Sequence, residues 1–154
     1  MADAPALTIC FDGASRGNPG KAAIGVVVLR NGVPVREISE TIGQATNNVS
    51  EYRALLRGLE EAEALGARRV QILSDSELVV RQLSGRYRVR SPSLIALHRD
   101  ALTRLRKFDR VSIRHVPREE NRGADALANR ALDDLAAASS ESGQRTPRVG
   151  VDPG

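Results

Sequence analysis

The sequence contains no tryptophan, only two tyrosines and two phenylalanines, and a single cysteine among its 154 residues. Four aromatic rings are too few for the base-stacking surface of a single-strand-binding protein. Cys10 has no partner for a disulfide or a cysteine-based metal cluster, which is typical of a reduced, cytoplasmic compartment. No window approaches the roughly 18 apolar residues of a membrane-spanning helix, and the N-terminal segment lacks the basic region and apolar core of a signal peptide. We therefore expect a cytoplasmic, soluble protein with no membrane partner.

The length suits one domain, because a chain of this size buries roughly two thirds of its unfolded surface without disulfides. Apolar periodicity ends near Ala138, and the segment SSESGQRTPRVGVDPG that follows shows none. We expect a folded domain over residues 1–138 and a disordered C-terminal tail over residues 139–154. The change in composition at Ser139 is also typical of a domain boundary.

Positive charge is concentrated in one segment, although the net charge is only +4. Residues 81–114 contain ten lysines or arginines and only two acids, Asp100 and Asp109. A basic segment beside clustered acids suits a nucleic acid, whose phosphates need cations while metal ions fill the acidic site. A solvated helix face with surplus arginine is the alternative.

Apolar periodicity predicts an α/β fold that begins with three antiparallel strands. The turns Gly17-Asn18-Pro19-Gly20 and Asn31-Gly32 separate these strands, and the second is a strong hairpin signal. Helical spacing then alternates with two short strands. A strand, helix, strand order makes the fourth strand parallel to the first, with a right-handed crossover. The strands are expected at 7–11, 22–29, 33–42, 70–73 and 111–116, and the helices at 52–65, 78–83, 93–108 and 121–138.

Four acids occupy comparable places: Asp12 and Asp75 at strand ends, and Glu51 and Asp125 at helix beginnings. Because the carboxyl ends of parallel strands adjoin, we expect Asp12 and Asp75 to be neighbours in a ligand-binding crevice. Four close carboxylates repel one another and raise each other's pKa unless cations neutralise them. Mg²⁺ and Mn²⁺, which prefer oxygen ligands, are the natural counter-ions.

Each acid also has a purely structural explanation. Asp12 could begin a loop, Asn48 and Glu51 have the spacing of a capping box, and Asp75 or Ser76 could cap the following helix. Asp125 is favoured near a helix N-terminus by the macrodipole. The coincidence of all four with a glycine-rich turn and a basic segment favours the metal site.

Short motifs follow one another along the chain: Asp12-Gly13, Gly17-Asn18-Pro19-Gly20, Thr46-Asn47-Asn48, Glu51, Asp75-Ser76, His115 and Asn121-x-x-x-Asp125-x-Leu127-Ala128. In order and spacing, this set resembles type 1 ribonuclease H. The resemblance covers about residues 7–136 and implies a ribonuclease H-like fold, a five-stranded mixed sheet of order 3-2-1-4-5 with strand 2 antiparallel, flanked by helices. It also implies an endonuclease that hydrolyses the RNA strand of RNA–DNA hybrids, leaving a 5′-phosphate and a 3′-hydroxyl.

The resemblance assigns the four acids to two Mg²⁺ ions, with Mn²⁺ as a possible substitute. Asp12 would bridge both ions, Glu51 and Asp75 would hold the ion on the leaving-group side, and Asp125 would hold the ion that activates water. Two ions stabilise both oxygens of an in-line displacement. His115, ten residues before Asp125, corresponds to a mobile histidine that assists proton transfer or product departure.

The resemblance also implies the contacts to the hybrid. Main-chain groups of Gly13, Ala14 and Ser15 would read 2′-hydroxyls, which distinguish RNA from DNA. Amide side chains can both donate and accept hydrogen bonds in the minor groove. These would be Asn18, Asn47 and Asn48, with Thr46 at a DNA phosphate and Arg86 and Arg88 as a short basic grip.

The sequence departs from familiar members at several positions. The tryptophan beside the DNA channel is absent, and Tyr87 is its candidate replacement. The segment 85–92 is too short for a basic handle, and Glu77 stands where relatives often carry glutamine. The loop after His115 lacks the usual glycines, so that Arg118 or Glu119 could share the histidine's role.

Two other functions stay open at this point. A nuclease of the same fold could act on DNA junctions or double-stranded RNA, since fold alone does not fix the substrate. A hybrid-binding module without catalysis is the second alternative, although binding alone needs no four-carboxylate site. We expect an active enzyme that works as a monomer, with an RNA–DNA hybrid as its partner and no obligatory protein partner.

Overall fold

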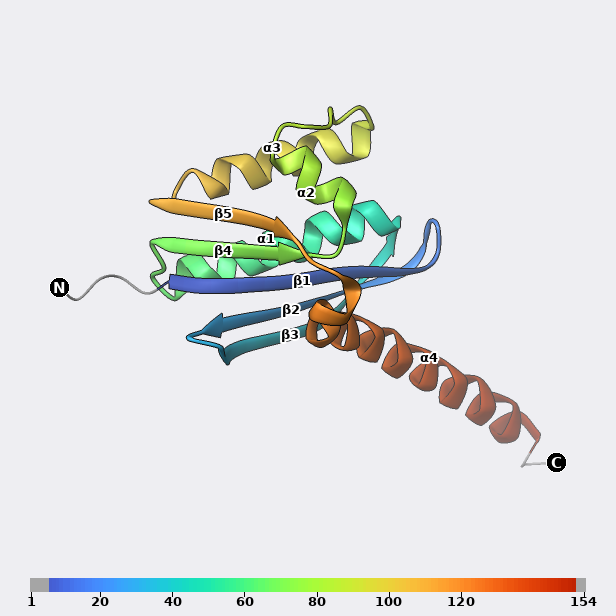
Figure 1. Cartoon of the computed structure of the whole chain (residues 1–154). Coiled ribbons are helices and arrows are strands. Elements are labelled where there is room, and N and C mark those ends of the chain that lie inside the picture. The colour runs from blue at the N-terminus through green and yellow to red at the C-terminus, as the bar shows by residue number, and fades with distance from the viewer. Residues whose placement is uncertain (1–5, 152–154) are drawn as a thin grey trace.

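A five-stranded sheet of order β3-β2-β1-β4-β5 forms the centre of the chain (Figure 1). The computed structural model describes residues 6–151, with side chains over residues 6–139. Strand β2 is antiparallel to β1 and β3, and β4 is parallel to β1 and β5, as predicted. The elements are β1 (Ala6–Gly17), β2 (Gly20–Arg30), β3 (Val33–Ala45), α1 (Asn47–Ala64), β4 (Arg69–Ser74), α2 (Glu77–Leu83), α3 (Pro92–Leu105), β5 (Arg110–His115), the 3-10 turn η1 (Arg118–Asn121) and α4 (Arg122–Val151).

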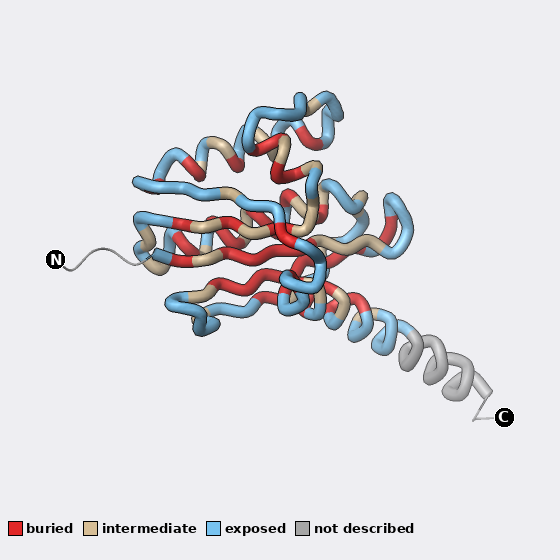
Figure 2. The backbone as a smooth tube through the Cα atoms, in the orientation of Figure 1, coloured by how far each residue is buried: buried red, intermediate tan, exposed pale blue. Residues whose placement is uncertain are grey.

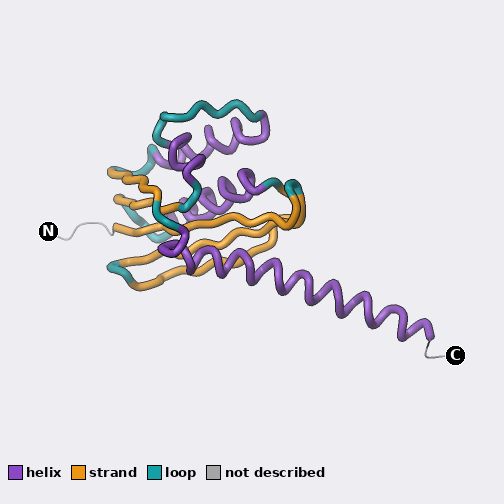
Figure 3. Tube along the Cα trace, turned by 45° about the vertical axis from the view of Figure 1, so that its right-hand side comes forward, coloured by secondary structure: helices purple, strands orange, loops and turns teal. Residues whose placement is uncertain are grey.

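Helices cover the two faces of the sheet unequally (Figures 1 and 3). Helix α1 packs on β1 and β2 from one face, with α3 against α1, and α4 packs on β1, β2 and β3 from the other. On the α1 side, Ile9 and Phe11 meet Leu55 in the main core, and all three are fully buried. Each such side chain contributes about 1.5 to 3 kcal/mol of hydrophobic free energy. The alternation of β1 therefore turns Cys10 and Asp12 toward the α4 face.

Strand β1 is longer than predicted, and this changes the place of Asp12. The sequence predicted Asp12 at the end of a strand, whereas β1 continues to Gly17. Parallel pairing with β4 stops at Cys10 and Leu73, but antiparallel pairing with β2 continues to the turn. Asp12 thus lies within β1, just past the end of β4, because β1 and β2 extend as a two-stranded ribbon.

Helix α4 also differs from the prediction. A helix end at residue 138 and a disordered segment after it were expected, whereas α4 continues to Val151. The predicted end followed the loss of apolar periodicity, which reports packing rather than backbone conformation. An established helix adds one hydrogen bond per residue without a new nucleation cost. Residues 152–154 of the predicted tail lie outside the described residues, and the division into a domain and a tail stays a prediction.

Among the described residues, none of the helices combines the length and the apolar character that a membrane crossing requires.

Candidate active site

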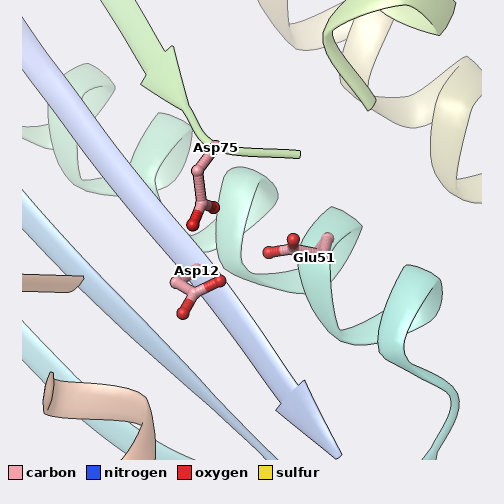
Figure 4. A group of neighbouring side chains, drawn as sticks. All are labelled: Asp12, Glu51 and Asp75. Carbon is pink, nitrogen blue, oxygen red and sulfur yellow. The ribbon is translucent and has the colours of Figure 1, made fainter. Parts of the chain in front are cut away.

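Three of the four predicted acids converge at the carboxyl end of β4 (Figure 4). One carboxylate oxygen each of Asp12, Glu51 and Asp75 lies within 4.8 Å of the other two. Asp125, from the beginning of α4, lines the same cavity of about 410 Å³ and helps to raise the pKa of Asp12. The four residues predicted from separate segments therefore form one site.

A close approach between α1 and β1 places Glu51. The main-chain N–H of Gly13 donates to Glu51 Oε1 at 2.6 Å. A Cβ on Gly13 would lie only 2.2 Å from the main-chain carbon of Ser50, so a side chain there would push α1 away. The capping box suggested by Asn48 and Glu51 is wrong: Thr46 is the N-cap, and its hydroxyl accepts from Val49 N–H at 3.2 Å. Glu51 is therefore left available to the site.

A second close approach places Asp125. Gly25 on β2 is the register partner of Asp12, and a Cβ there would lie 2.0 Å from the carbonyl oxygen of Ala124. Helix α4 can pass directly over β2 only because this position has no side chain. No role was predicted for Gly25 from the sequence, although a glycine inside an apolar strand often marks a close backbone approach.

Asp75 is held by Asn121, the first residue of the Asn121-x-x-x-Asp125 motif, for which no role was predicted from the sequence. Asn121 is 2% exposed, and its amide nitrogen donates to the Phe11 carbonyl at 2.9 Å and to Asp75 Oδ1 at 3.4 Å. This amide joins the end of η1 to both strands that carry metal-ligand candidates. A polar residue between two apolar segments was the available signal.

The site strongly disfavours negative charge in the metal-free chain. Burial, followed by the charge of Glu51, the hydrogen bond with Asp125 and the charge of Asp75, raises the pKa of Asp12 to about 9. Desolvation raises the pKa of Glu51 to about 7, against the lowering effect of the Gly13 N–H. The site thus needs bound positive charge to hold all four carboxylates ionised at neutral pH.

The residues fit hard divalent cations. Every acidic side chain that lines the cavity offers carboxylate oxygens, the donors that Mg²⁺ and Mn²⁺ prefer. The cavity lining contains one basic side chain, Arg118, whose Nη2 lies 3.4 Å from Asp125 Oδ1. One exposed arginine cannot balance four carboxylates, so the chain itself does not supply the missing charge.

The residues predicted to contact nucleic acid fall into two groups by place, those at or next to the carboxylate cavity and those in the loop between α2 and α3. Gly13, Ala14, Ser15 and Asn47 line the carboxylate cavity. Asn47 N–H donates to Asn18 Oδ1 at 3.1 Å, which holds the turn after β1 against the beginning of α1. Asn18, Asn47 and Asn48 are exposed and Thr46 is half-buried beside them. Arg86 and Arg88 are exposed in the loop between α2 and α3 and lie outside this lining.

His115 ends β5 and does not line the carboxylate cavity. Its Nε2 lies 3.3 Å from the main-chain oxygen of Asp75, on an exposed ring. The short η1 turn that follows brings Arg118 into the cavity lining. Arg118 therefore lies beside the carboxylates, whereas His115 lies outside their cavity and contacts the main chain of Asp75.

Comparison with known proteins gives consistent matches. A family model described as "Reverse transcriptase-like" matches residues 10–131. Ribonuclease HI of Halobacterium salinarum is 50% identical over 125 residues, which are 80% of this chain and 63% of that protein. A bifunctional protein of Mycobacterium tuberculosis is 46% identical over 143 residues, 92% of this chain and 39% of that protein.

Solved structures agree. The crystal structure of RNase H1 from H. salinarum aligns with a TM-score of 0.82 and 48% identity, covering 84% of this chain and 98% of that one. LC11-RNase H1 in complex with an RNA/DNA hybrid aligns with a TM-score of 0.79 and 39% identity, covering 84% and 99%. The chain belongs to the ribonuclease H family.

Family membership confirms the resemblance and the fold predicted from the motifs. The sheet order 3-2-1-4-5, the antiparallel β2 and the flanking helices are those of a ribonuclease H fold. The chain spans 39% and 63% of the length of the two curated relatives named above. As a member of the ribonuclease H family, it carries its four carboxylates on β1, on α1, directly after β4 and on α4.

Proposed function

We propose that this chain is an endonuclease that hydrolyses the RNA strand of RNA–DNA hybrids with two divalent cations, Mg²⁺ or Mn²⁺. The observation that carries the proposal is the convergence of Asp12, Glu51, Asp75 and Asp125 in one cavity. A structural neighbour with 39% identity is described in complex with an RNA/DNA hybrid, which supports this substrate class. We also propose that the chain acts in the cytoplasm as a monomer without an obligatory protein partner.

The carboxylates divide into two overlapping ligand sets. Asp12 lies among the other three and would belong to both sets, with Glu51 and Asp75 on one side and Asp125 on the other. Two bound cations would neutralise the attacking and leaving oxygens of an in-line displacement. Gly13 and Asn121 hold Glu51 and Asp75 in position, so that the ligand oxygens are already oriented when substrate arrives.

The reaction is the addition of water to the scissile phosphorus and the breaking of its bond to the 3′-oxygen. The products are a 5′-phosphate and a 3′-hydroxyl, and the departing oxygen must gain a proton. His115, behind Asp75, is proposed to assist this transfer or the departure of product. Arg118, whose guanidinium contacts Asp125, is proposed to act beside the histidine by stabilising the negative charge of the scissile phosphate.

Recognition would use the exposed amides next to the cavity. Asn18, Asn47 and Asn48 are proposed to contact base edges in the minor groove, and Thr46 a DNA phosphate. The main chain of Gly13 to Ser15, which lines the cavity, is proposed to bind 2′-hydroxyls. Arg86 and Arg88 would add a sequence-independent attraction to phosphates.

Cleavage of a hybrid with a labelled RNA strand tests the proposal. We expect cutting of the RNA strand alone with Mg²⁺ or Mn²⁺ and no cutting with EDTA. The cleavage rate of Asp12→Asn should be at least about 1,000-fold lower than that of wild type, because the variant lacks a ligand proposed to be common to both metals. Duplex DNA and duplex RNA serve as parallel substrates. Preferred cutting of duplex RNA would replace the hybrid as substrate, and hybrid binding without cutting under any metal would favour a binding module.

A further inference from the structure

A second cavity, of about 280 Å³, lies between α2 and the end of β5. It adjoins the carboxylate site, because Glu77 follows Asp75 by two residues and the His115 ring contacts the Asp75 main chain. Its polar lining consists of Glu77, Arg81, Ser84, Arg86, Arg114 and His115. Three arginines and a histidine thus share this cavity with one carboxylate at the border of the metal site.

Arg81 is already arranged to bind an anion. Its Nε and Nη2 groups both donate to Glu77 Oε2, at 3.0 and 2.7 Å. The guanidinium carbon also lies 5.4 Å from the centre of the Tyr87 ring, so the side chain is held between the carboxylate and the ring. A planar guanidinium fork in this state binds a phosphate oxygen as readily as a carboxylate oxygen.

Glu77 is the one carboxylate in the lining of this cavity, and it pairs with Arg81. Within residues 6–139, neither Arg86 nor Arg114 forms a salt bridge with a carboxylate. One carboxylate therefore shares the cavity with three arginines and a histidine, which leaves positive charge for another anion.

We propose that this cavity is a phosphate site. It binds one backbone phosphodiester of an intact strand whose scissile phosphate lies at the carboxylates. In the free protein, the Glu77 carboxylate competes with that phosphodiester for Arg81. Successive phosphates along a strand are about 3.4 Å apart along the helix axis. A strand at Asp75 therefore presents a further phosphate within reach of Arg81. The inference rests on the proposed function, since it assumes a bound nucleic-acid strand.

Affinity for an RNA–DNA hybrid in the Asp12→Asn background, where the strand is not cut, tests the proposal. We expect Arg81→Ala to weaken binding about tenfold and to lower the slope of log affinity against log salt by about one. Glu77→Gln removes the competitor and should strengthen binding severalfold. The matched controls are Arg106→Ala directly after α3 and Glu37→Gln on β3, which make the same charge changes elsewhere and should shift affinity less than twofold.

Two further arms separate the possible results. Inorganic phosphate should shift the Arg81 Nε–H resonance in NMR, at lower concentration in Glu77→Gln, and an absent shift overturns the site even if the hybrid binds. Affinity changes in Arg81→Ala and Glu77→Gln that are no larger than those of the controls also overturn the phosphate site and leave the proposed function intact. A protein that binds no hybrid overturns both the phosphate site and the proposed function. A third comparison uses a nicked hybrid with a 5′-phosphate at the nick, the same nicked hybrid with a 5′-hydroxyl, and the intact hybrid. If Arg81→Ala lowers the affinity only for the 5′-phosphorylated nicked hybrid, the ligand is a product end and the proposal is wrong.

Discussion

The side-chain amide of Asn121 is hydrogen-bonded to the carboxylate of Asp75 at 3.4 Å. The same nitrogen also donates to the carbonyl of Phe11, the residue before Asp12. One buried amide therefore sets the spacing between the strands that carry two ligand candidates. Partners of metal-ligating side chains that orient them in this way usually affect metal affinity as well as stability.

Replacing Asn121 with alanine should affect both properties. The buried Phe11 carbonyl loses its partner, which costs about 1 to 3 kcal/mol and lowers the melting temperature by roughly 3 to 10 °C. Asp75 loses its support, so the Mg²⁺ concentration that gives half-maximal cleavage should rise about 10- to 100-fold. A Mg²⁺ titration of kcat on a cleavable hybrid measures this. A lowered melting temperature with an unchanged Mg²⁺ midpoint would mean that Asn121 acts on folding alone.

The contact between Gly25 and α4 makes a separate prediction. Gly25→Ala places a methyl group against the Ala124 carbonyl, where a Cβ would lie at 2.0 Å, so α4 must move. We expect a loss of about 3 kcal/mol or more and strongly reduced cleavage, because Asp125 moves with α4. Gly123→Ala is the control, since its Cβ would contact only a methyl of Val27 at 3.3 Å. Thermal unfolding and cleavage rates of the two variants should differ clearly; equal effects would contradict the assigned role of Gly25.

The raised pKa of Asp12 predicts how the stability of the metal-free chain depends on pH. An unfolded aspartate has a pKa of about 4, and Asp12 in the fold has one of about 9. The folded state therefore binds this proton more tightly, so its contribution is complete below about pH 4 and is lost as pH rises toward 9. Glu51 adds a loss in the same direction up to about pH 7.

Asp12→Asn should consequently stabilise the metal-free protein while abolishing cleavage. With EDTA at pH 8, we expect a gain on the order of 1 to 3 kcal/mol over wild type and a flatter dependence of melting temperature on pH. Mg²⁺ at 100 times its dissociation constant should add about 2.7 kcal/mol to the free energy of unfolding of wild type and so raise its melting temperature. The same Mg²⁺ concentration should have little effect on the variant. Scanning calorimetry from pH 5 to 9 checks both. A variant less stable than wild type at pH 8 would contradict the desolvation argument.

Arg118 provides a test of charge at the edge of the site. Its side chain is 76% exposed and contacts Asp125. Arg118→Ala should lower kcat by about tenfold, less than the loss from a buried donor, because solvent screens this group. The Mg²⁺ midpoint should fall, since a neighbouring positive charge has been removed. Arg122→Ala, an exposed neighbour outside the cavity lining, is the control and should leave kcat within twofold; a Mg²⁺ midpoint that rises in Arg118→Ala would contradict this electrostatic role.

Local sequence was sufficient to predict that the acids converge, but not which contacts bring them together. In the sequence Asp12 and Asp75 each follow an apolar run and Glu51 lies at the beginning of a helix, so their convergence could be inferred from the order of strands and helices. The contact of Gly25 with Ala124 joins segments a hundred residues apart, and no local pattern reports it. The positions of His115 and Arg118 depend on how η1 packs after β5, which propensity does not determine.

The order of the strands also determines which parts of the site open first. Strand β1 is paired on both sides up to Cys10, and its side chains Leu7, Ile9 and Phe11 are buried, whereas β5 is an edge strand with mostly exposed residues (Figure 2). Amide hydrogens in the doubly paired part of β1 should exchange only on global unfolding, and those of β5 by local opening with a much lower free energy. His115 can therefore leave and return with the end of β5, while Asp12 stays two residues from the slowest-exchanging part of the sheet.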